Sequence, residues 1–245
     1  MNQYIYGIRA IIEAIESGKQ IEKILLKKQF KSELLNSLRQ IAKFHQIPIQ
    51  YVPIEKLNKI TRQNHQGAIA LVSPITFWKL DELISDTYDN GQTPLLLILD
   101  RITDVHNFGA IIRTAECTAT TGIIIPKKNT AQLSGDAMKT SVGALNYVPI
   151  VRMILSDAVD RLHQLGFQTI AATEKADKTI YEVDFTLPTA IIMGSEEKGI
   201  AFDLLKKSDI QAKIPILGKI QSLNVSVASS LFMYEAVRQR LFAKK

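Results

Sequence analysis

Residues 95–116 read LLLILDRITDVHNFGAIIRTAE. The first five residues are all apolar, which predicts a short strand buried on both faces. A polar loop follows, and from Phe108 to Thr118 apolar residues recur at helical spacing, which predicts a helix. A strand that passes through a loop into a helix is the repeating unit of α/β proteins. Because open α/β sheets bind ligands beyond the carboxyl ends of their strands, this loop is also a candidate binding site.

The same alternation continues from residue 94 to the end of the chain. Strands are predicted at 95–99, 122–125, 147–151, 167–171, 189–193 and 210–214, and helices at 108–118, 134–142, 156–165, 202–207 and 223–242. This order predicts a mostly parallel sheet with helices on both faces. One face of the last helix carries Leu223, Val227 and Leu231 together with Ala228 and Phe232, and this apolar face predicts a buried role.

The front third of the chain has a smaller α/β pattern of its own. Helices are predicted at 6–17, 32–44 and 54–60, and strands at 24–26, 47–52 and 67–72. Residues 1–75 are therefore expected to form a small independent domain, which is within the usual size range. Residues 76–93 are polar and acidic and end in a turn before Pro94, so they are expected to be a linker to a second domain at 94–245.

The positive charge of the chain is concentrated in this front domain. The 245 residues include 30 Lys and Arg against 24 Asp and Glu, a net charge of +6. Residues 1–75 hold 11 of the basic and 5 of the acidic residues, so the remainder is neutral at 19 against 19. A basic module joined to a neutral one suggests that the basic part binds a polyanion. The alternative is that it merely has a basic, solvated surface.

Composition and missing motifs exclude several classes of protein. With 46% hydrophobic and 22% charged residues the chain is neither disordered nor fibrous. No apolar run approaches the roughly 18 residues of a membrane span, and no signal peptide is readable, so we expect a cytoplasmic protein without a membrane partner. The lone Cys117 and four scattered histidines argue against a disulfide and a metal site. No two glycines stand at Gly-x-Gly spacing, so the dinucleotide-binding motif is missing. Ile200 occupies the position of the P-loop lysine, which disfavours an NTPase.

Two further loops follow predicted strands. Residues 194–200 read Gly-Ser-Glu-Glu-Lys-Gly-Ile, and two glycines five apart suggest a tight loop that approaches a ligand closely. Residues 222–226 read Ser-Leu-Asn-Val-Ser and open the last helix. Each loop also has a structural explanation, because Asn, Ser and Glu are favoured at helix starts. Likewise, Asn107 could cap a helix and Arg113 could pair with Glu116 on its surface.

Taken together, the three loops resemble a known family. Asn-x-Gly-x-x-x-Arg at 107–113, Gly-Ser-Glu-x-x-Gly-Ile at 194–200 and Ser-Leu-Asn-Val-Ser at 222–226 are similar, in order and spacing, to motifs of the SpoU branch of the SPOUT methyltransferases. In the front third, Tyr-Gly-Ile-Arg-Ala at 6–10 and His-Gln-Gly-Ala at 65–68 resemble phrases of the substrate-binding domain attached to many members. The resemblance implies methyl transfer from S-adenosylmethionine to a ribose 2′-hydroxyl of RNA. It also implies a deep C-terminal trefoil knot and a homodimer formed through the knotted domain.

The resemblance also assigns the site residues. Backbone at Gly194, Ile214 and Leu223 is expected to bind the cofactor, and no metal is expected. Catalytic roles are implied for Asn107, Arg113, Glu196, Ser222 and Asn224. Because Glu196 and Glu197 are adjacent, the sequence leaves open which carboxylate matters; Glu196 follows Gly-Ser directly and is preferred.

The implied roles of these side chains differ in their chemistry. The family role of Arg113 is to accept a proton. A guanidinium keeps its positive charge near neutral pH, so we expect Arg113 to bind the RNA phosphate or polarise the 2′-hydroxyl. Asn107 and Ser222 would then orient Arg113 or the ribose, Asn224 would brace the cofactor loop, and Glu196 would hold Asn107 or that loop.

The two-domain layout is most similar to bacterial enzymes that methylate a guanosine ribose of 23S ribosomal RNA, so this RNA is the expected partner. A guanosine 2′-O-methyltransferase of tRNA and a resistance-type rRNA methyltransferase of the same branch are alternatives. A non-catalytic RNA-binding assembly factor is the alternative from another class. A base methyltransferase is disfavoured, because it would need an acidic group near a guanine ring nitrogen.

Overall fold

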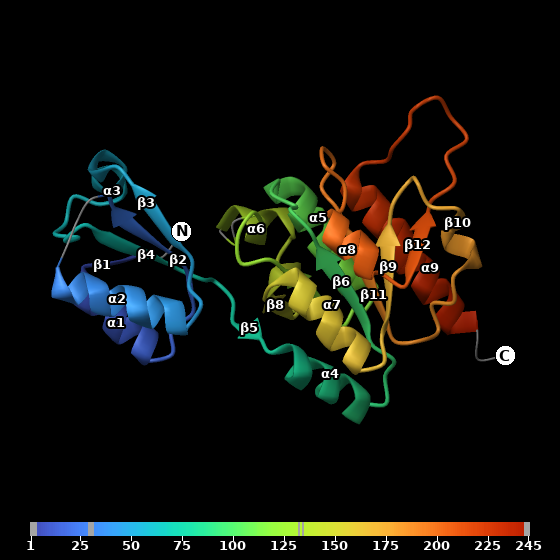
Figure 1. Ribbon diagram of the computed structural model, residues 1–245, viewed down its shortest axis with the longest axis horizontal. Coiled ribbons are helices and arrows are strands. Elements are labelled where there is room, and N and C mark those ends of the chain that lie inside the picture. The colour runs from blue at the N-terminus through green and yellow to red at the C-terminus, as the bar shows by residue number, and fades with distance from the viewer. Residues whose placement is uncertain (1–3, 29–31, 132, 134, 243–245) are drawn as a thin grey trace. The chain divides into compact units, whose positions relative to one another are not determined.

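A computed structural model describes residues 4–28, 32–131, 133 and 135–242 of the chain (Figure 1). The chain divides into two compact units. The first comprises Met1–Thr76 with Leu133–Gly135, and the second comprises Phe77–Gln132 with Asp136–Lys245. Among the described residues, no helix has both the length and the apolar character needed to cross a bilayer.

The first unit is a four-stranded sheet between helices. Its strands are β1 (Tyr4–Tyr6), β2 (Ile21–Lys27), β3 (Ile49–Val52) and β4 (Ala68–Val72), in the order β1-β4-β2-β3. Helices α1 (Ile8–Glu16) and α2 (Glu33–Phe44) bury Ile11 and Leu38 against Ile24 on one face. Helix α3 (Ile54–Ile60) buries Leu57 against Ile69 on the other. The expected small α/β pattern is therefore observed.

One element at the start of this unit was not expected. The helix predicted from residue 6 begins only at Ile8, because Tyr4–Tyr6 pair with β4 as an edge strand. A three-residue strand is too short to show alternation of apolar and polar residues. Its partner, which lies more than sixty positions further along the chain, supplies the pairing that the local sequence does not reveal.

The second unit is built on an eight-stranded sheet in which every pairing is parallel. Its order is β10-β12-β9-β11-β6-β7-β8-β5. The strands are β5 (Phe77–Trp78), β6 (Leu95–Leu99), β7 (Gly122–Ile125), β8 (Ile150–Arg152), β9 (Gln168–Ala172), β10 (Lys178–Thr179), β11 (Thr189–Met193) and β12 (Ile210–Lys213). All residues of the central strands β6 and β11 are buried. The prediction of a mostly parallel α/β sheet is confirmed.

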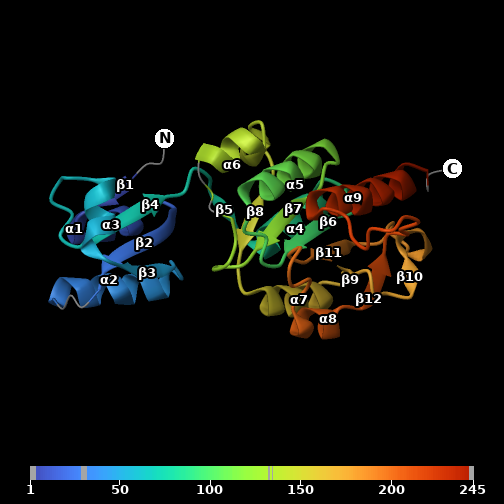
Figure 2. The ribbon, with the colours of Figure 1, turned by 90° about the horizontal axis from the view of Figure 1, so that it is seen from above.

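Helices cover both faces of this sheet. They are α4 (Leu80–Asp89), α5 (Val105–Cys117), α6 (Gly135–Thr140), α7 (Leu155–Gln164), α8 (Phe202–Lys207) and α9 (Val225–Phe242), with short 3-10 turns η1 (Ala144–Asn146) and η2 (Ile180–Glu182). Helices α4, α7 and α8 share one apolar core with the strands. Helices α5 and α9 contact each other on the opposite face, as Figure 2 shows, and Thr114 Oγ1 lies 3.1 Å from Ser230 Oγ between them.

Residues 77–93 of the expected linker at 76–93 are instead part of the second unit. Strand β5 pairs with β8, and α4 buries Leu80, Leu83 and Ile84 in the core of the large sheet. These three residues share one helical face although the segment as a whole is acidic. Average composition therefore suggested a linker where the spacing of a few apolar residues makes a packed helix.

The apolar face predicted for the last helix is divided in the structure. Phe232 is buried, whereas Val227 and Leu231 are 47% and 40% exposed. The side of α9 that is buried within the chain carries Val225, Ser229, Phe232, Met233, Glu235 and Ala236. Val227 and Leu231 are therefore not buried within one chain, and their burial at a dimer interface stays a prediction. The trefoil knot stays a prediction.

Candidate active site

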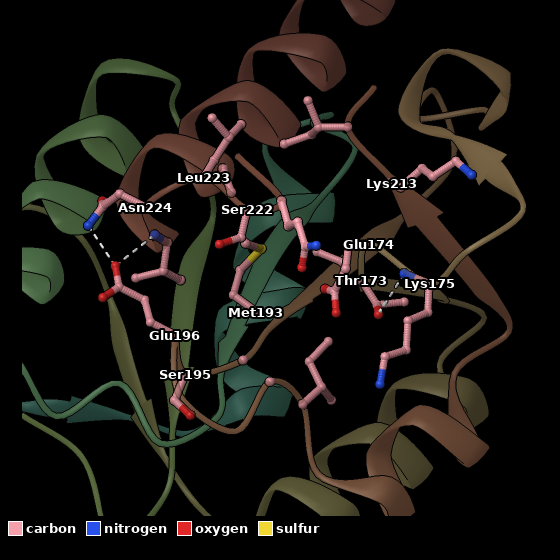
Figure 3. A pocket seen from close by; sticks show the side chains of 18 of the residues that line it. Thr173, Glu174, Lys175, Met193, Ser195, Glu196, Lys213, Ser222, Leu223 and Asn224 are labelled. Atoms are coloured by element: carbon pink, nitrogen blue, oxygen red, sulfur yellow. Dashed lines mark hydrogen bonds between the residues drawn. The ribbon is translucent and has the colours of Figure 1, made fainter. Parts of the chain in front are cut away.

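One cavity of about 770 Å³ opens at the carboxyl ends of three neighbouring strands (Figure 3). Its walls are residues 172–175 from the end of β9, 193–200 from the end of β11, and 212–214 and Ile216 at the end of β12, together with the chain around the start of α9. This is the edge at which parallel α/β sheets bind ligands. The volume is within the range of small-molecule sites, about 300–1,000 Å³.

The loop at 194–200 depends on both of its glycines. A Cβ on Gly194 would lie 2.2 Å from the Gly199 carbonyl carbon and 2.3 Å from Ile200 N, so no larger residue fits without moving the backbone. Gly199 has a φ of +61°, and its N–H donates to Ser195 O at 2.8 Å. The loop therefore closes on itself, and Ser195 does not begin a helix as the structural explanation would require.

Three of the expected catalytic residues are joined by hydrogen bonds beside this cavity: Glu196 and Asn224 line it, and Asn107 contacts both of them. Glu196 Oε1 accepts a hydrogen bond from Asn224 Nδ2 at 2.6 Å, from Val225 N at 3.2 Å and from Asn107 Nδ2 at 3.3 Å. Asn224 Nδ2 also donates to Asn107 Oδ1 at 3.0 Å. These side chains come from α5, the loop after β11 and the residue before α9. Glu196 is thus the shared acceptor, and no hydrogen bond of Glu197 is found among the described residues.

Asn224 both caps helix α9 and contributes to the site. At helix α5 these two roles belong to different residues. Asn224 Oδ1 accepts from Ser226 N at 2.9 Å and so caps α9, while its Nδ2 faces Glu196. At α5 the cap is Asp104, whose carboxylate accepts from the N–H groups of His106 and Asn107. The expectation that Asn107 might cap this helix is wrong. Because Asp104 takes that role, the side chain of Asn107 is available to Glu196.

The remaining expected residues divide between the cavity and the outer surface. Gly194, Ile214, Ser222 and Leu223 all line the cavity. Within the described chain, Arg113 is not part of the cavity wall, is exposed, and forms no ion pair with Glu116. Six residues along a helix rotate a side chain by about 240°, so Arg113 points to a different side of α5 from Asn107. The expectation that both border one cleft is not met in a single chain.

Part of the wall had not been expected from the sequence. Thr173, Glu174, Lys175 and Lys213 line the side of the cavity opposite Asn224. Thr173 directly follows β9, so the rule that ligands bind at strand carboxyl ends could have indicated this segment. The lining lysines, Lys175, Lys198 and Lys213, are matched in number by the glutamates Glu174, Glu196 and Glu197. The cavity is therefore charged but balanced. No cluster of His, Cys, Asp or Glu able to hold a metal occurs in the described ranges.

The fold and cavity define a parallel α/β protein with a small-molecule site at its strand ends. The chain belongs to the SpoU rRNA methylase family, whose model matches residues 94–234. A second model, described as RNA 2′-O ribose methyltransferase substrate binding, matches residues 4–78. The resemblance of the motifs to the SpoU branch is confirmed.

Named relatives match over almost the whole chain. A Staphylococcus aureus (strain MSSA476) protein, whose name places it in the TrmH family of tRNA/rRNA methyltransferases, is 38% identical over 240 residues, covering 96% of each chain. YacO of Bacillus subtilis (strain 168), with a name of the same family, is 33% identical over 240 residues, covering 98% of this chain and 96% of its own.

Solved structures share the fold. The SpoU methyltransferase AviRb from Streptomyces viridochromogenes, in complex with its cofactor AdoMet, superposes with a TM-score of 0.62 at 24% identity, covering 98% of this chain and 91% of that one. The A. aeolicus TrmH/SpoU tRNA modifying enzyme has a TM-score of 0.58 at 26% identity, covering 66% of this chain and 86% of its own.

Proposed function

We propose that this protein transfers the methyl group of S-adenosylmethionine to a ribose 2′-hydroxyl of RNA. The observation that carries the proposal is the network of Asn107, Glu196 and Asn224 beside a cavity of cofactor size. Family membership and the AdoMet complex of AviRb support the same reaction class. When bound, S-adenosylmethionine supplies a methyl group on a sulfonium, open to in-line attack by an oxygen.

The residues of the cavity fit this cofactor. The absence of a side chain at Gly194 lets the 194–200 loop close against Gly199 and Ile200, and Gly194, Ile214 and Leu223 all line the cavity. We assign these three positions to cofactor binding, through main-chain polar groups at strand ends. Asn107, Glu196 and Asn224 then position the cofactor loop and the ribose, with Ser222 beside them. Holding two reactants in line can contribute roughly 7–11 kcal/mol to lowering the barrier.

Arg113 completes this site if the protein is a homodimer. His106, Ala110, Arg113 and Cys117 follow one another at helical spacing on the outer side of α5. Thr114, next to Arg113, touches Ser230 of α9, whose neighbouring face exposes Val227, Leu231 and Tyr234. Burying this face against a second copy would remove apolar surface from water. We propose a dimer through α5 and α9 that brings Arg113 to the partner's cavity, where it binds phosphate or polarises the 2′-hydroxyl.

We propose that the basic first unit recognises the substrate RNA. A ribose hydroxyl looks alike at every nucleotide, so selectivity needs contacts to shape and phosphates elsewhere. We propose a guanosine of 23S ribosomal RNA as the target, because of the attached basic domain. A tRNA guanosine is the second candidate, since the names of the relatives include both RNA classes.

A methyl-transfer assay tests the reaction. Purified protein would be incubated with tritiated S-adenosylmethionine and either 23S rRNA or tRNA, and the labelled nucleotide identified. We expect the label on a 2′-oxygen, which makes the next phosphodiester resistant to alkali. Label on a base, or no label with any RNA, would contradict the proposal.

Replacing Gly194 by alanine should weaken cofactor binding. The added Cβ would overlap the Gly199 backbone, and forcing an extra methyl into a packed position costs about 1–3 kcal/mol. We therefore expect an affinity for S-adenosylhomocysteine lower by about 10-fold or more, measured by calorimetry. The matched control is Gly218→Ala, where no heavy atom lies within 4 Å of the added Cβ. Equal binding by both variants would contradict the assignment of Gly194.

Deleting residues 1–75 should separate cofactor binding from RNA selection. The deletion removes the whole net charge of +6 and leaves the larger sheet complete. We expect unchanged affinity for S-adenosylhomocysteine but loss of preference for the native RNA over an unrelated one. Equal selectivity of the shortened and full chains would assign RNA recognition to the second unit instead.

A further inference from the structure

A pair of charged residues at the end of β6 contacts the cavity loop from outside. Arg101 donates to Asp100 through Nε to Oδ1 at 3.1 Å and through Nη2 to Oδ2 at 2.9 Å. The same Nη2 donates to Gly199 O at 3.1 Å. Asp100 Oδ2 also accepts from Ala201 N at 2.7 Å. One ion pair therefore holds two backbone groups that lie about a hundred positions away in the chain.

Both the burial of the Asp100 carboxylate and the backbone conformation of Arg101 cost free energy unless other contacts compensate for them. Asp100 is only 5% exposed, and a buried carboxylate needs a charged partner and hydrogen bonds to be tolerated. Arg101 has a φ of +60°, a left-handed conformation that non-glycine residues rarely adopt. This conformation lies directly after Asp100, and in it the Arg101 guanidinium folds back to donate to the Asp100 carboxylate. Strain of this kind persists where the surrounding structure imposes it, often at functional sites.

The contacts fall at both ends of the cavity loop. Before the loop, Asp100 N donates to Met193 O at 2.8 Å, continuing the pairing of β6 with β11. After the loop, Asp100 and Arg101 hold Ala201 and Gly199. Between these points Glu196 is held by Asn107 and Asn224 on the cavity side. The loop is thus held by two separate sets of contacts. Asn107 and Asn224 hold it at the cavity, and the pair of Asp100 and Arg101 holds it away from the cavity.

We propose that Asp100 and Arg101 are positioning residues for the cofactor, acting through the 194–200 loop without touching the ligand. Neither residue lines the cavity, whereas every residue from Gly194 to Ile200 does. The pair sets the carbonyl of Gly199 and the turn into α8, and so the shape of the cavity wall. This inference rests on the proposed function, because it concerns the binding of S-adenosylmethionine.

Arg101→Asn is the variant that tests the proposal. Asparagine tolerates the left-handed backbone but is too short to span from Asp100 to Gly199. Loss of hydrogen bonds to charged groups should weaken binding of S-adenosylhomocysteine by about 10- to 100-fold. We expect KM for S-adenosylmethionine to rise by a similar factor, with kcat at saturating cofactor and KM for RNA within about threefold of wild type.

Arg101→Lys and Arg161→Asn are the companion variants. Lysine keeps the positive charge beside Asp100 but cannot make the two-pronged contact, so it should restore folding stability fully and binding partly. Arg161 forms a similar two-pronged pair with Asp81, at 2.9 and 3.1 Å, on a surface away from the cavity. Its replacement should leave cofactor binding unchanged. Melting temperatures with and without S-adenosylhomocysteine would be recorded for all variants.

The possible results separate the two proposals. If the wild-type protein fails to bind S-adenosylhomocysteine, the proposed function and this inference both fall. If it binds and Arg101→Asn binds equally well, only the positioning role is overturned. A fall in kcat without a change in KM for the cofactor would also overturn it. If Arg101→Lys and Arg101→Asn lose binding only in proportion to the unfolded fraction, the pair is merely structural and the inference is wrong.

Discussion

Replacing Asn224 by alanine is expected to lower the rate of RNA methylation by about 100-fold, because Asn224 helps to position the reactants and a misplacement of about 1 Å can cost this much. The change removes both hydrogen bonds from Nδ2, so Glu196 loses its shortest partner and Asn107 loses its donor. It also removes the cap of α9, at about 1 kcal/mol of folding free energy. Single-turnover rates with 23S rRNA and tRNA would measure the effect.

The matched control for the cap is Asn224→Ser. Serine is an equally good N-cap but is too short to reach Glu196, so we expect wild-type stability with the same loss of rate. Glu196→Ala should resemble Asn224→Ala, whereas Glu197→Ala should have a much smaller effect. If Asn224→Ser were nearly as active as wild type, Asn224 would be a helix cap only. If Glu197→Ala were the more damaging change, the assignment of Glu196 would be wrong.

Replacing Arg113 by alanine is expected to lower methyl transfer by about 100- to 1,000-fold while leaving binding of S-adenosylhomocysteine unchanged. The guanidinium is exposed on α5, away from the cavity of its own chain. Its loss should therefore remove a contact to RNA and none to the cofactor. Single-turnover rates and calorimetry on the same preparation would separate these two effects.

Mixed dimers test where Arg113 acts. In a heterodimer of an Arg113→Ala chain with an Asn224→Ser chain, a shared site leaves one of the two cavities with both residues intact. We expect such heterodimers, isolated with two affinity tags, to regain about half the activity of the wild-type dimer, while each parent stays inactive. No recovery would place Arg113 in the site of its own chain. A wild-type protein that is monomeric at assay concentration would contradict the dimer itself.

The central strands of the large sheet were predicted for a simple physical reason, whereas the short edge strands β5 and β10 were not predicted. A strand buried on both faces is mostly apolar, so Leu95–Leu99 and Thr189–Met193 can be recognised without knowledge of their partners. Elements whose burial depends on distant partners were missed. The edge strand β1, the pair formed by β5 and β8, and the packed face of α4 all belong to this second kind.

The candidate site shows the same division. Motif resemblance was enough to select Asn107, Glu196 and Asn224, but it left open which of two adjacent acids matters and whether Asn224 is only a cap. The hydrogen bonds of Glu196 favour one acid, and the two ends of the Asn224 amide serve both purposes. Arg101 was not suspected at all, since nothing in the residues around it indicates a contact with Gly199.

By itself, the amino-acid sequence determined the alternation of strands and helices, the parallel sheet, the basic front domain and the residue types of three loops. Each of these depends on residues that are close together in the chain, through apolar periodicity, charge and turn-forming residues. Only the tertiary structure decided that α4 belongs to the large core, that Glu196 joins α5 to α9, and that Arg113 faces away from the cavity. Those outcomes depend on side chains from distant parts of the chain coming within hydrogen-bond or packing distance, which no local pattern encodes.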